Sequence, residues 1–250
     1  MMDNKKIRLV NSLKMNNSIR SIILVTVLIL AINNISFGAE EYSVDFLTGK
    51  YVAAKNEKLT KLSAEYCVGG KEIYVHKDAY FPLKNMILEA GKSGIKLEVI
   101  SGVRTFYHQK SIWDRKWSKY VAQGVKDETE IMREILKFSS MPGSSRHHWG
   151  TDFDFNSLEN SYFQSGKGKR EYEWLVQNGK RFGFCQVYKK ENIKGYSEEK
   201  WHWSYMALSE EMLKQYLQKV KYIDLAGFNG DKNADKLRVI EDYVSTINRN

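Results

Sequence analysis

The segment Asp152-Phe153-Asp154-Phe155 limits the possible folds of this chain more strongly than any other. It alternates between acids and aromatic rings, and in a β-strand residues two apart point to the same face. The pattern predicts a strand, within residues 150–156, that packs two phenylalanines into a core and presents two carboxylates on the other face. Those carboxylates repel each other unless a cation lies between them or unless the strand faces solvent at an edge.

Three of the five histidines lie in two short segments rich in aromatic residues. His147 and His148 precede the predicted strand. Because neighbours on an extended chain point to opposite sides, only one of them is expected to share a site with the aspartates. His202 lies between Trp201 and Trp203, which on a strand occupy the face opposite to the imidazole. The two tryptophans would then bury one side of the sheet while His202 faces a cleft.

Together these segments contain the parts of a hydrolytic zinc site. Such a site needs three protein ligands, an open position for water and a base that does not bind the metal. The segments offer His147, Asp154 and His202 as ligands and leave Glu199 as the base. The simpler alternatives are a hydrogen-bonded structural histidine and a surface turn that leads into a core strand. The helical His-Glu-x-x-His motif is missing from the sequence, and two cysteines are too few for a cysteine-based site.

The order of helical and strand patterns indicates the fold class. Hydrophobic residues make up 42% of the sequence and aromatic residues 13%, which is enough for a sizeable core. Strand patterns occupy the middle of the chain, and helical patterns come before, between and after them. This order favours an α+β fold in which helices pack on a small antiparallel sheet. Residues 44–76 are expected to be irregular; helices are predicted at 78–93, 105–121, 128–138, 169–182, 208–221 and 235–248, and strands at 95–99, 150–156, 184–188 and 201–205.

Residues 1–39 predict a signal peptide, or a membrane anchor if they are not cleaved. Basic side chains precede an apolar run from Ile22 to Ile32, and small residues follow it. This run is too short to span a bilayer comfortably and has the length of a signal-peptide core. Residues 40–250 are expected to form a single exported domain, whose membrane contact would come only from an uncleaved leader.

The leader also carries much of the positive charge. Residues 1–39 contain five basic side chains and one acid, so their removal lowers the formal charge from +9 to +5. A mildly basic domain favours an anionic envelope polymer as its partner. Basic residues are interleaved with acids and form no basic-aromatic stripe, so nucleic acid is not expected as a partner.

The two cysteines, Cys67 and Cys185, allow two interpretations. In an exported protein they are candidates for a disulfide, and two separate buried thiols are the alternative. The outcome depends on whether the fold brings their backbones within bonding distance.

Three motifs, in the expected order, resemble those of the VanY-type D-Ala-D-Ala carboxypeptidases. These enzymes belong to the LAS group of zinc peptidases, which cut bacterial cell-wall peptides. Residues 101–109, SGVRTFYHQ, are similar to the group's Ser-Gly-x-Arg-x-x-x-x-Gln segment. Residues 145–154, SRHHWGTDFD, resemble Ser-x-His-x-x-Gly-x-x-x-Asp, and residues 199–202, EKWH, resemble the second signature. The similarity extends from about Phe46 to the final helix.

This resemblance implies the LAS fold, also described as hedgehog/D-Ala-D-Ala peptidase-like, with Zn²⁺ as the cofactor. It also implies roles for the matched residues. Arg104 would stabilise the developing oxyanion or hold a substrate carboxylate, tasks that suit a fixed, forked positive charge. The implied zinc ligands are His147, Asp154 and His202, the implied base and then acid is Glu199, and the expected substrate-binding residues are Gln109, Ser145 and Asp152.

Asp152 departs from the pattern of the family, because many relatives carry a small residue, often alanine, at this position. An acid here has three expected roles. It could change the charge at the zinc, accept a hydrogen bond from a ligand histidine, or bind Arg104.

The predicted function is an exported zinc carboxypeptidase that removes the C-terminal D-alanine from peptidoglycan stem peptides, in the periplasm or the extracellular cell wall. Zinc-activated water would attack the peptide, with Glu199 as general base and acid. The alternatives within the group are a peptidoglycan endopeptidase and a D-Ala-D-Ala dipeptidase. From another class, the alternative is a non-catalytic wall-binding domain, which would be expected to lose Glu199 or Arg104. The sequence contains no signal for an oligomeric state.

Overall fold

The computed structural model describes residues 40–191 and 194–249. Residues 41–250 form one structural unit, and the predicted signal peptide over residues 1–39 lies outside the described residues. Within the described ranges, no helix combines the length and the apolar character needed to cross a bilayer.

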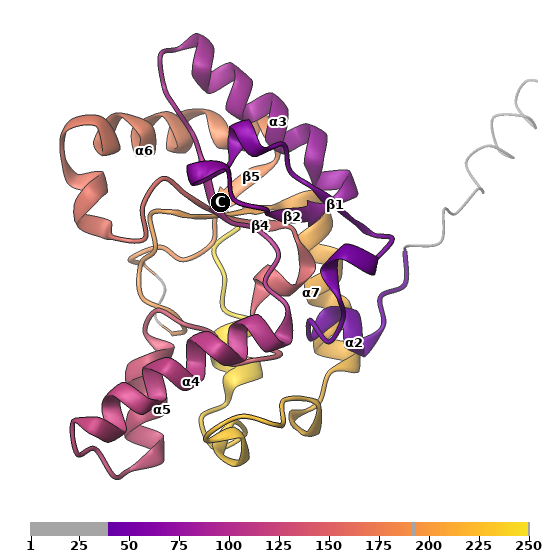
Figure 1. Ribbon diagram of the computed structural model, residues 1–250, viewed down its shortest axis with the longest axis vertical. Helices are drawn as coiled ribbons and strands as arrows, with labels where there is room; N and C mark the ends of the chain where they lie inside the picture. Colours follow the sequence, from indigo (N-terminus) through magenta and orange to yellow (C-terminus); the bar gives the residue numbers. More distant parts are fainter. Residues whose placement is uncertain (1–39, 192–193, 250) are drawn as a thin grey trace, which may run out of the picture. The chain divides into compact units, whose positions relative to one another are not determined.

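A four-stranded antiparallel sheet carries Asp152, Asp154 and His202 of the sequence motifs (Figure 1). Its central strands are β4 and β6, and their register puts Asp154 directly opposite His202. A separate antiparallel pair is formed by β1 and β2. The predicted α+β fold with small antiparallel sheets is confirmed. In order across the larger sheet, the strands are β3 (Val99–Ser101), β4 (Asp152–Phe155), β6 (His202–Tyr205) and β5 (Phe184–Gln186), and the smaller pair is β1 (Leu59–Lys61) and β2 (Tyr74–His76).

Two helices, α3 and α6, pack against one face of this sheet. In Figure 1, α3 and α6 lie above it, and α4 and α5 lie below it. The core on the upper side contains Phe153 and Phe155 of β4, together with Met86 of α3 and Trp174 of α6. This packing confirms the apolar face predicted for the strand. The helices are α2 (Val44–Leu47), α3 (Lys77–Lys92), α4 (Phe106–Ala122), α5 (Glu128–Leu136), α6 (Gly166–Asn178) and α7 (Met206–Lys219).

A second core joins α4 to α5 and contains Trp113, Ile131 and Ile135. α4 begins directly after β3 and a short link, with Thr105 as its N-cap, whose hydroxyl accepts a hydrogen bond from the backbone of His108. The helix therefore leaves the sheet at the residue after Arg104. This junction holds Arg104 at the edge of the sheet.

The strand predicted at residues 95–99 begins only at Val99. The side chain of Asn156 replaces strand pairing before it: Asn156 Oδ1 accepts from the backbone N–H of Glu98, and its Nδ2 donates to the carbonyl of Lys96. Asn156 has a positive φ of 60°, so β4 ends there and offers no further strand to pair with. The alternating sequence of residues 95–99 therefore forms a strand only where β4 is present to pair with it.

Other boundaries also differ from the prediction. α3 begins at Lys77, with the side chain of His76 rather than Asp78 accepting the capping hydrogen bond. The helix predicted at 235–248 is only a short π-helical turn over Val239–Val244. The segment 44–76, expected to be irregular, contains α2, β1 and β2. Tertiary pairing decides these short elements, and local patterns do not encode it.

Cys67 and Cys185 are free, buried thiols, so the second of the two interpretations is confirmed. Burial raises the pKa of both thiols. Neither cysteine is therefore activated as a nucleophile.

Candidate metal centre and active-site cleft

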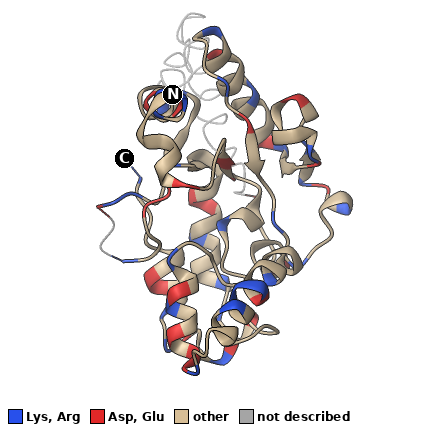
Figure 2. Cartoon of the chain, turned by 60° about the vertical axis from the view of Figure 1, so that its left-hand side comes forward, with Lys and Arg blue, Asp and Glu red and all other residues tan. Residues whose placement is uncertain are grey.

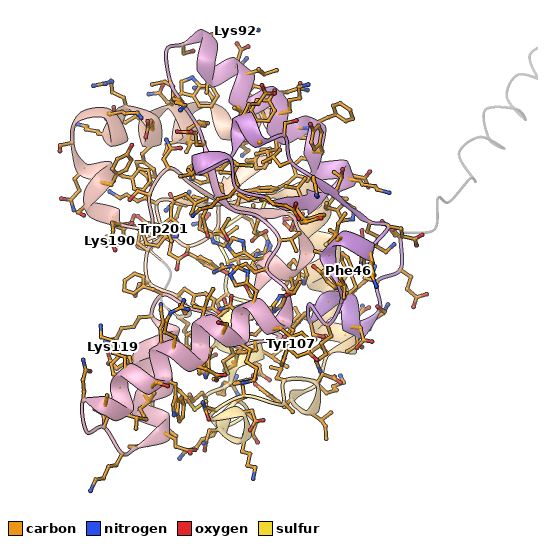
Figure 3. All side chains as sticks on the ribbon, viewed as in Figure 1. Phe46, Lys92, Tyr107, Lys119, Lys190 and Trp201 are labelled. Carbon is orange, nitrogen blue, oxygen red and sulfur yellow. The ribbon has the colours of Figure 1, made fainter. Side chains whose placement is uncertain are left out.

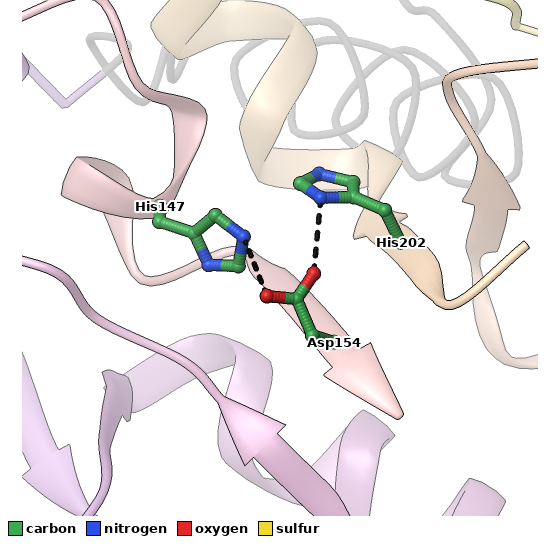
Figure 4. Close-up of side chains that lie close together, drawn as sticks. All are labelled: His147, Asp154 and His202. Carbon is green, nitrogen blue, oxygen red and sulfur yellow. Dashed lines mark ion pairs between the residues drawn. The ribbon is translucent and has the colours of Figure 1, made fainter. Parts of the chain in front are cut away.

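Three side chains that the sequence offered as ligands converge at the centre of the sheet (Figure 4). Asp154 and His202 are cross-strand partners on β4 and β6, and His147 comes from the short 3-10 turn Arg146–Trp149. His147 Nε2 lies 3.3 Å from Asp154 Oδ2, and His202 Nδ1 lies 3.2 Å from Asp154 Oδ1. One nitrogen or oxygen of each residue lies within 4.8 Å of the others.

The donor atoms of this cluster fit a metal ion. All three side chains are buried, yet His147 Nε2 and Asp154 Oδ1 make no hydrogen bond to any described residue. Buried polar atoms are almost always satisfied, so such an unused pair calls for an ion or a water between them. The other nitrogen of His147, Nδ1, lies 2.8 Å from the carbonyl of Gly102. A proton on Nδ1 leaves the lone pair of Nε2 facing the cluster.

His148 has a different environment from His147. Its Nε2 accepts from the backbone of Gly143, and its Nδ1 lies 2.5 Å from the carbonyl of Arg104. Burial lowers the pKa of His148 to about 3, so the ring is neutral. The expectation that only one of the two histidines joins the aspartates is confirmed, although the chain turns in a 3-10 helix here and is not extended.

Asp152 lies behind His202, away from the cleft. Its Oδ2 is 3.0 Å from His202 Nε2 and 2.8 Å from the Nε of Arg146, while its Oδ1 accepts from Ser204 Oγ. Arg146 in turn donates from Nη2 to Ser204 Oγ. Burial opposes ionisation of Asp152, but the positive charge of Arg146 and the hydrogen bonds hold the pKa of this carboxyl well below its usual range.

The place of Asp152 decides among its three expected roles. Asp152 accepts a hydrogen bond from His202, which is the second of the expected roles. Its ion pair is with Arg146 and not with Arg104, so the third expected role is wrong. It is fully buried, so substrate does not reach it. Arg146 and Ser204 were not predicted as site residues, and the sequence signal for Arg146 was its place beside His147.

His202 lies between the two aspartates of β4. Burial opposes its protonation, but Asp152 on one side and Asp154 on the other raise the pKa of His202 to about 9 in the protein without metal. The i, i+2 spacing of the two acids on β4 thus places both carboxylates against one imidazole.

Glu199 lies just before β6, and its Oε2 is 3.5 Å from His202 Nδ1. The side chain is buried. Burial, and secondarily the charge of Asp154, raises the pKa of Glu199 to about 8, although His202 opposes this shift. A carboxyl group with a pKa raised in this way takes up and releases a proton near neutral pH.

Arg104 lies beside Asp154 of the cluster. Its Nη2 lies 3.9 Å from Asp154 Oδ2, and its backbone N–H donates to the carbonyl of His147. The side chain keeps 19% of its surface exposed, so the guanidinium is accessible from the cleft.

A cleft of about 630 Å³ opens beside the cluster, between α4 and the sheet. In Figure 3, Trp201 lies on the sheet side and Lys119 lies on α4. Trp201 lines the cleft, whereas Trp203 packs in the core, so the two tryptophans do not share the buried face expected of them. The lining residues are Arg104, Ile112, Arg115, Lys116, Phe138, Ser139, Asp154, Leu158, Glu159, Asn160, Ser161, Glu199 and Trp201.

Gln109 and Ser145, expected to bind substrate, are both buried and lie outside this lining. Gln109 faces the interior side of α4, where its Nε2 donates to the carbonyl of Ser140. Ser145 precedes the turn that carries His147, and its hydroxyl makes no hydrogen bond to the described residues. In this structure Gln109 supports the loop before the turn.

Two imidazoles and a carboxylate that converge, with a buried glutamate beside them, are the side chains typical of a metal-dependent hydrolase. The family can be named from the sequence. The VanY family, described as D-alanyl-D-alanine carboxypeptidase, matches residues 72–208, and the chain belongs to this family. The resemblance to the VanY-type carboxypeptidases that the sequence motifs indicated is confirmed.

Two curated relatives show the same similarity. A D-alanyl-D-alanine carboxypeptidase of Enterococcus faecalis is 31% identical over 156 residues, which cover 62% of this chain and 55% of that protein. The putative carboxypeptidase YodJ of Bacillus subtilis is 29% identical over 162 residues, which cover 60% of this chain and 56% of that protein. The chain thus matches just over half the length of each relative.

Solved structures confirm the LAS-type fold. A mutant of the vancomycin-resistance D,D-pentapeptidase VanY with bound Zn(II) has a TM-score of 0.50 and 28% identity, covering 67% of this chain and 88% of the other. VanYB with D-alanine-D-alanine also has a TM-score of 0.50, with 30% identity over 67% and 86% of the two chains. The LD-carboxypeptidase LdcB has a TM-score of 0.50 and 25% identity, covering 69% and 81%.

Proposed function

We propose that this protein is an exported zinc carboxypeptidase that removes the C-terminal D-alanine from peptidoglycan stem peptides. The observation that carries the proposal is the convergence of His147, Asp154 and His202 beside a cleft that Glu199 and Arg104 line. Similar VanY structures hold Zn(II) and D-alanine-D-alanine, which supports the same metal and the same peptide end here. The signal-peptide pattern of residues 1–39 supports export.

In this proposal the zinc ligands are His147 through Nε2, His202 through Nδ1 and Asp154 through its carboxylate. Their two nitrogens and one carboxylate are donors that zinc prefers, and three protein ligands leave a position for water. Zinc bound there supplies a Lewis acid for the scissile carbonyl and lowers the pKa of a bound water to about 7.

Glu199 moves the proton. Its carboxylate takes a proton from the attacking water and then gives that proton to the amine of the departing D-alanine. Burial suits this task, because a carboxylate shielded from solvent gains much by accepting a proton. Of the three residues in the ligand cluster, Glu199 contacts His202 alone among the described residues. The distance from Glu199 Oε2 to His202 Nδ1 is 3.5 Å.

Arg104 holds the charge that develops on the carbonyl oxygen. Its guanidinium is permanently positive and reaches the cleft beside Asp154. A positive group already in place stabilises the oxyanion without reorganising during the reaction.

The test is the product pattern of the zinc-loaded protein on a stem pentapeptide that ends in D-Ala-D-Ala, followed by mass spectrometry. Release of one D-alanine supports the proposal. Release of D-Ala-D-Ala would instead identify a dipeptidase, and a cut within the stem would identify an endopeptidase. A protein that binds zinc and leaves the peptide intact would be a non-catalytic wall-binding domain.

A further inference from the structure

One wall of the cleft carries two cations, Arg115 and Lys116, that form no ion pair within the described part of the chain. Arg115 and Lys116 project from α4 and line the cleft together with Arg104. Among the described residues, no carboxylate lies within the 4.0 Å ion-pair distance of Arg115 or Lys116. Lys116 Nζ donates to the hydroxyl of Ser139, which is neutral.

The cations of this wall also act on one another. Burial lowers the pKa of Lys116, and the positive charges of Arg104, Arg115 and Lys119 lower it further, although Glu199 opposes them. Burial likewise lowers the pKa of His108, with Arg104 and Arg115 contributing. Like charges gathered in this way repel one another, so an anion bound among them relieves that repulsion.

The acids of the cleft act on Arg115 and Lys116 only from beyond ion-pair distance, as Glu199 does on Lys116. Asp154 contacts both histidines of the ligand cluster, and Glu199 contacts His202. Glu159, the third acid that lines the cleft, pairs with no cation of the described chain. Elsewhere on α4 a cation is neutralised, since Lys110 pairs with Asp114. Over the rest of the chain, basic and acidic residues are interspersed (Figure 2).

The length of the wall indicates which part of a substrate it faces. A helix rises about 1.5 Å per residue, so Arg115 lies about 14 Å along α4 from Phe106, the first residue of the helix. An extended peptide advances about 3.3 Å per residue, so this length corresponds to about four substrate residues. A carboxypeptidase holds one residue beyond the bond it cuts. The wall is therefore long enough to face the residues before that bond.

We infer that Arg115 and Lys116 form a subsite for a carboxylate side chain in the peptide, N-terminal to the scissile bond. The inference rests on the proposed function and narrows its substrate class to acidic peptides that end in D-Ala-D-Ala. The carboxylate of such a side chain binds the guanidinium of Arg115 and the ammonium of Lys116 through charge-assisted hydrogen bonds. A neutral amide at the same place leaves both cations without a counter-ion.

The experiment compares matched peptides that end in D-Ala-D-Ala and carry glutamate or glutamine at one of the three positions that precede these two alanines. Binding is measured by calorimetry on the zinc-loaded Glu199→Gln variant, so that turnover does not interfere. At one of the positions the glutamate peptide should bind about tenfold more tightly, an effect of one charge-assisted contact of about 1.4 kcal/mol. Raising the salt concentration should shrink this preference, because salt screens charges in an open cleft.

Adding Arg115→Gln and Lys116→Gln to this variant should remove the preference for glutamate, whereas Lys110→Gln should keep it. Lys110 is a matched control, because it lies on the same helix but is already paired with Asp114. Equal affinity for glutamate and glutamine peptides at all three positions would overturn the inference, and this comparison needs neither wall variant to fold. If glutamate is preferred but the active protein releases no D-alanine, the subsite stands and the proposed function fails.

Discussion

Asp152 and Arg146 form a buried ion pair behind His202, and removing half of this pair should affect the fold and the metal site separately. Arg146 is 1% exposed, and its Nε lies 2.8 Å from Asp152 Oδ2. Removing one partner of a buried pair leaves an uncompensated charge, at a cost of about 3–5 kcal/mol. Asp152→Ala should lower the free energy of unfolding of the zinc-free protein by this amount, measured by urea denaturation in the presence of a chelator.

The same substitution should weaken zinc binding. Asp152 Oδ2 lies 3.0 Å from His202 Nε2, so it keeps a proton on that nitrogen and leaves Nδ1 facing the cluster. Loss of such a supporting carboxylate typically costs about 10- to 100-fold in metal affinity. Competition with a chromophoric chelator measures this affinity directly. Asp152→Asn retains an oxygen that can accept the same hydrogen bond, so it should lose less affinity than Asp152→Ala.

A double variant separates the two effects. With Arg146→Met and Asp152→Ala combined, neither buried charge remains, so much of the lost stability should return. Zinc affinity should stay low, because His202 still lacks its acceptor. The reasoning is refuted if Asp152→Ala binds zinc as tightly as the unmodified protein, or if the double variant restores zinc affinity along with stability.

Three further measurements test other parts of the structure. Zinc at about 100 times its Kd should add about 2.7 kcal/mol of stability, so chelation should lower the calorimetric Tm by roughly 5–10 °C; an unchanged Tm would contradict the ligand cluster. Phe153→Ala should cost about 3–5 kcal/mol in equilibrium denaturation, because the ring is fully buried under α3; a loss below about 1 kcal/mol would contradict the core described for β4. Arg115→Gln should raise the pKa of His108 in an NMR titration, since it removes a charge that opposes protonation; no rise would show that the wall cations are not close together.

The alternation of polar and apolar residues along the chain predicted the features of the site that lie within a single strand. The alternation of Asp152 to Phe155 correctly predicted which face enters the core and which meets a histidine. It succeeded because the period of a strand is two whatever the strand pairs with. The same argument predicted that only one of the two adjacent histidines joins the aspartates, and this holds although the backbone turns there in a 3-10 helix.

Features that depend on pairing between distant segments were not predicted. The register that sets Asp154 opposite His202 joins residues nearly fifty positions apart, and no local pattern encodes it. The contact of Arg146 with Asp152 and Ser204 depends on the same register. The burial of Gln109 was missed because a glutamine on a helix is usually exposed, whereas here it supports the loop at Ser140.

The most direct test of the account is turnover by the zinc-loaded Glu199→Gln variant on the D-Ala-D-Ala pentapeptide, beside Glu198→Gln as a control. Glu198 is the adjacent residue of the same type and does not line the cleft. A carboxylate that carries the proton contributes about 10²- to 10⁴-fold to the rate. The account predicts that Glu199→Gln keeps its zinc and loses D-alanine release by this factor, while Glu198→Gln retains it. Release at the unmodified rate by zinc-loaded Glu199→Gln would contradict the account.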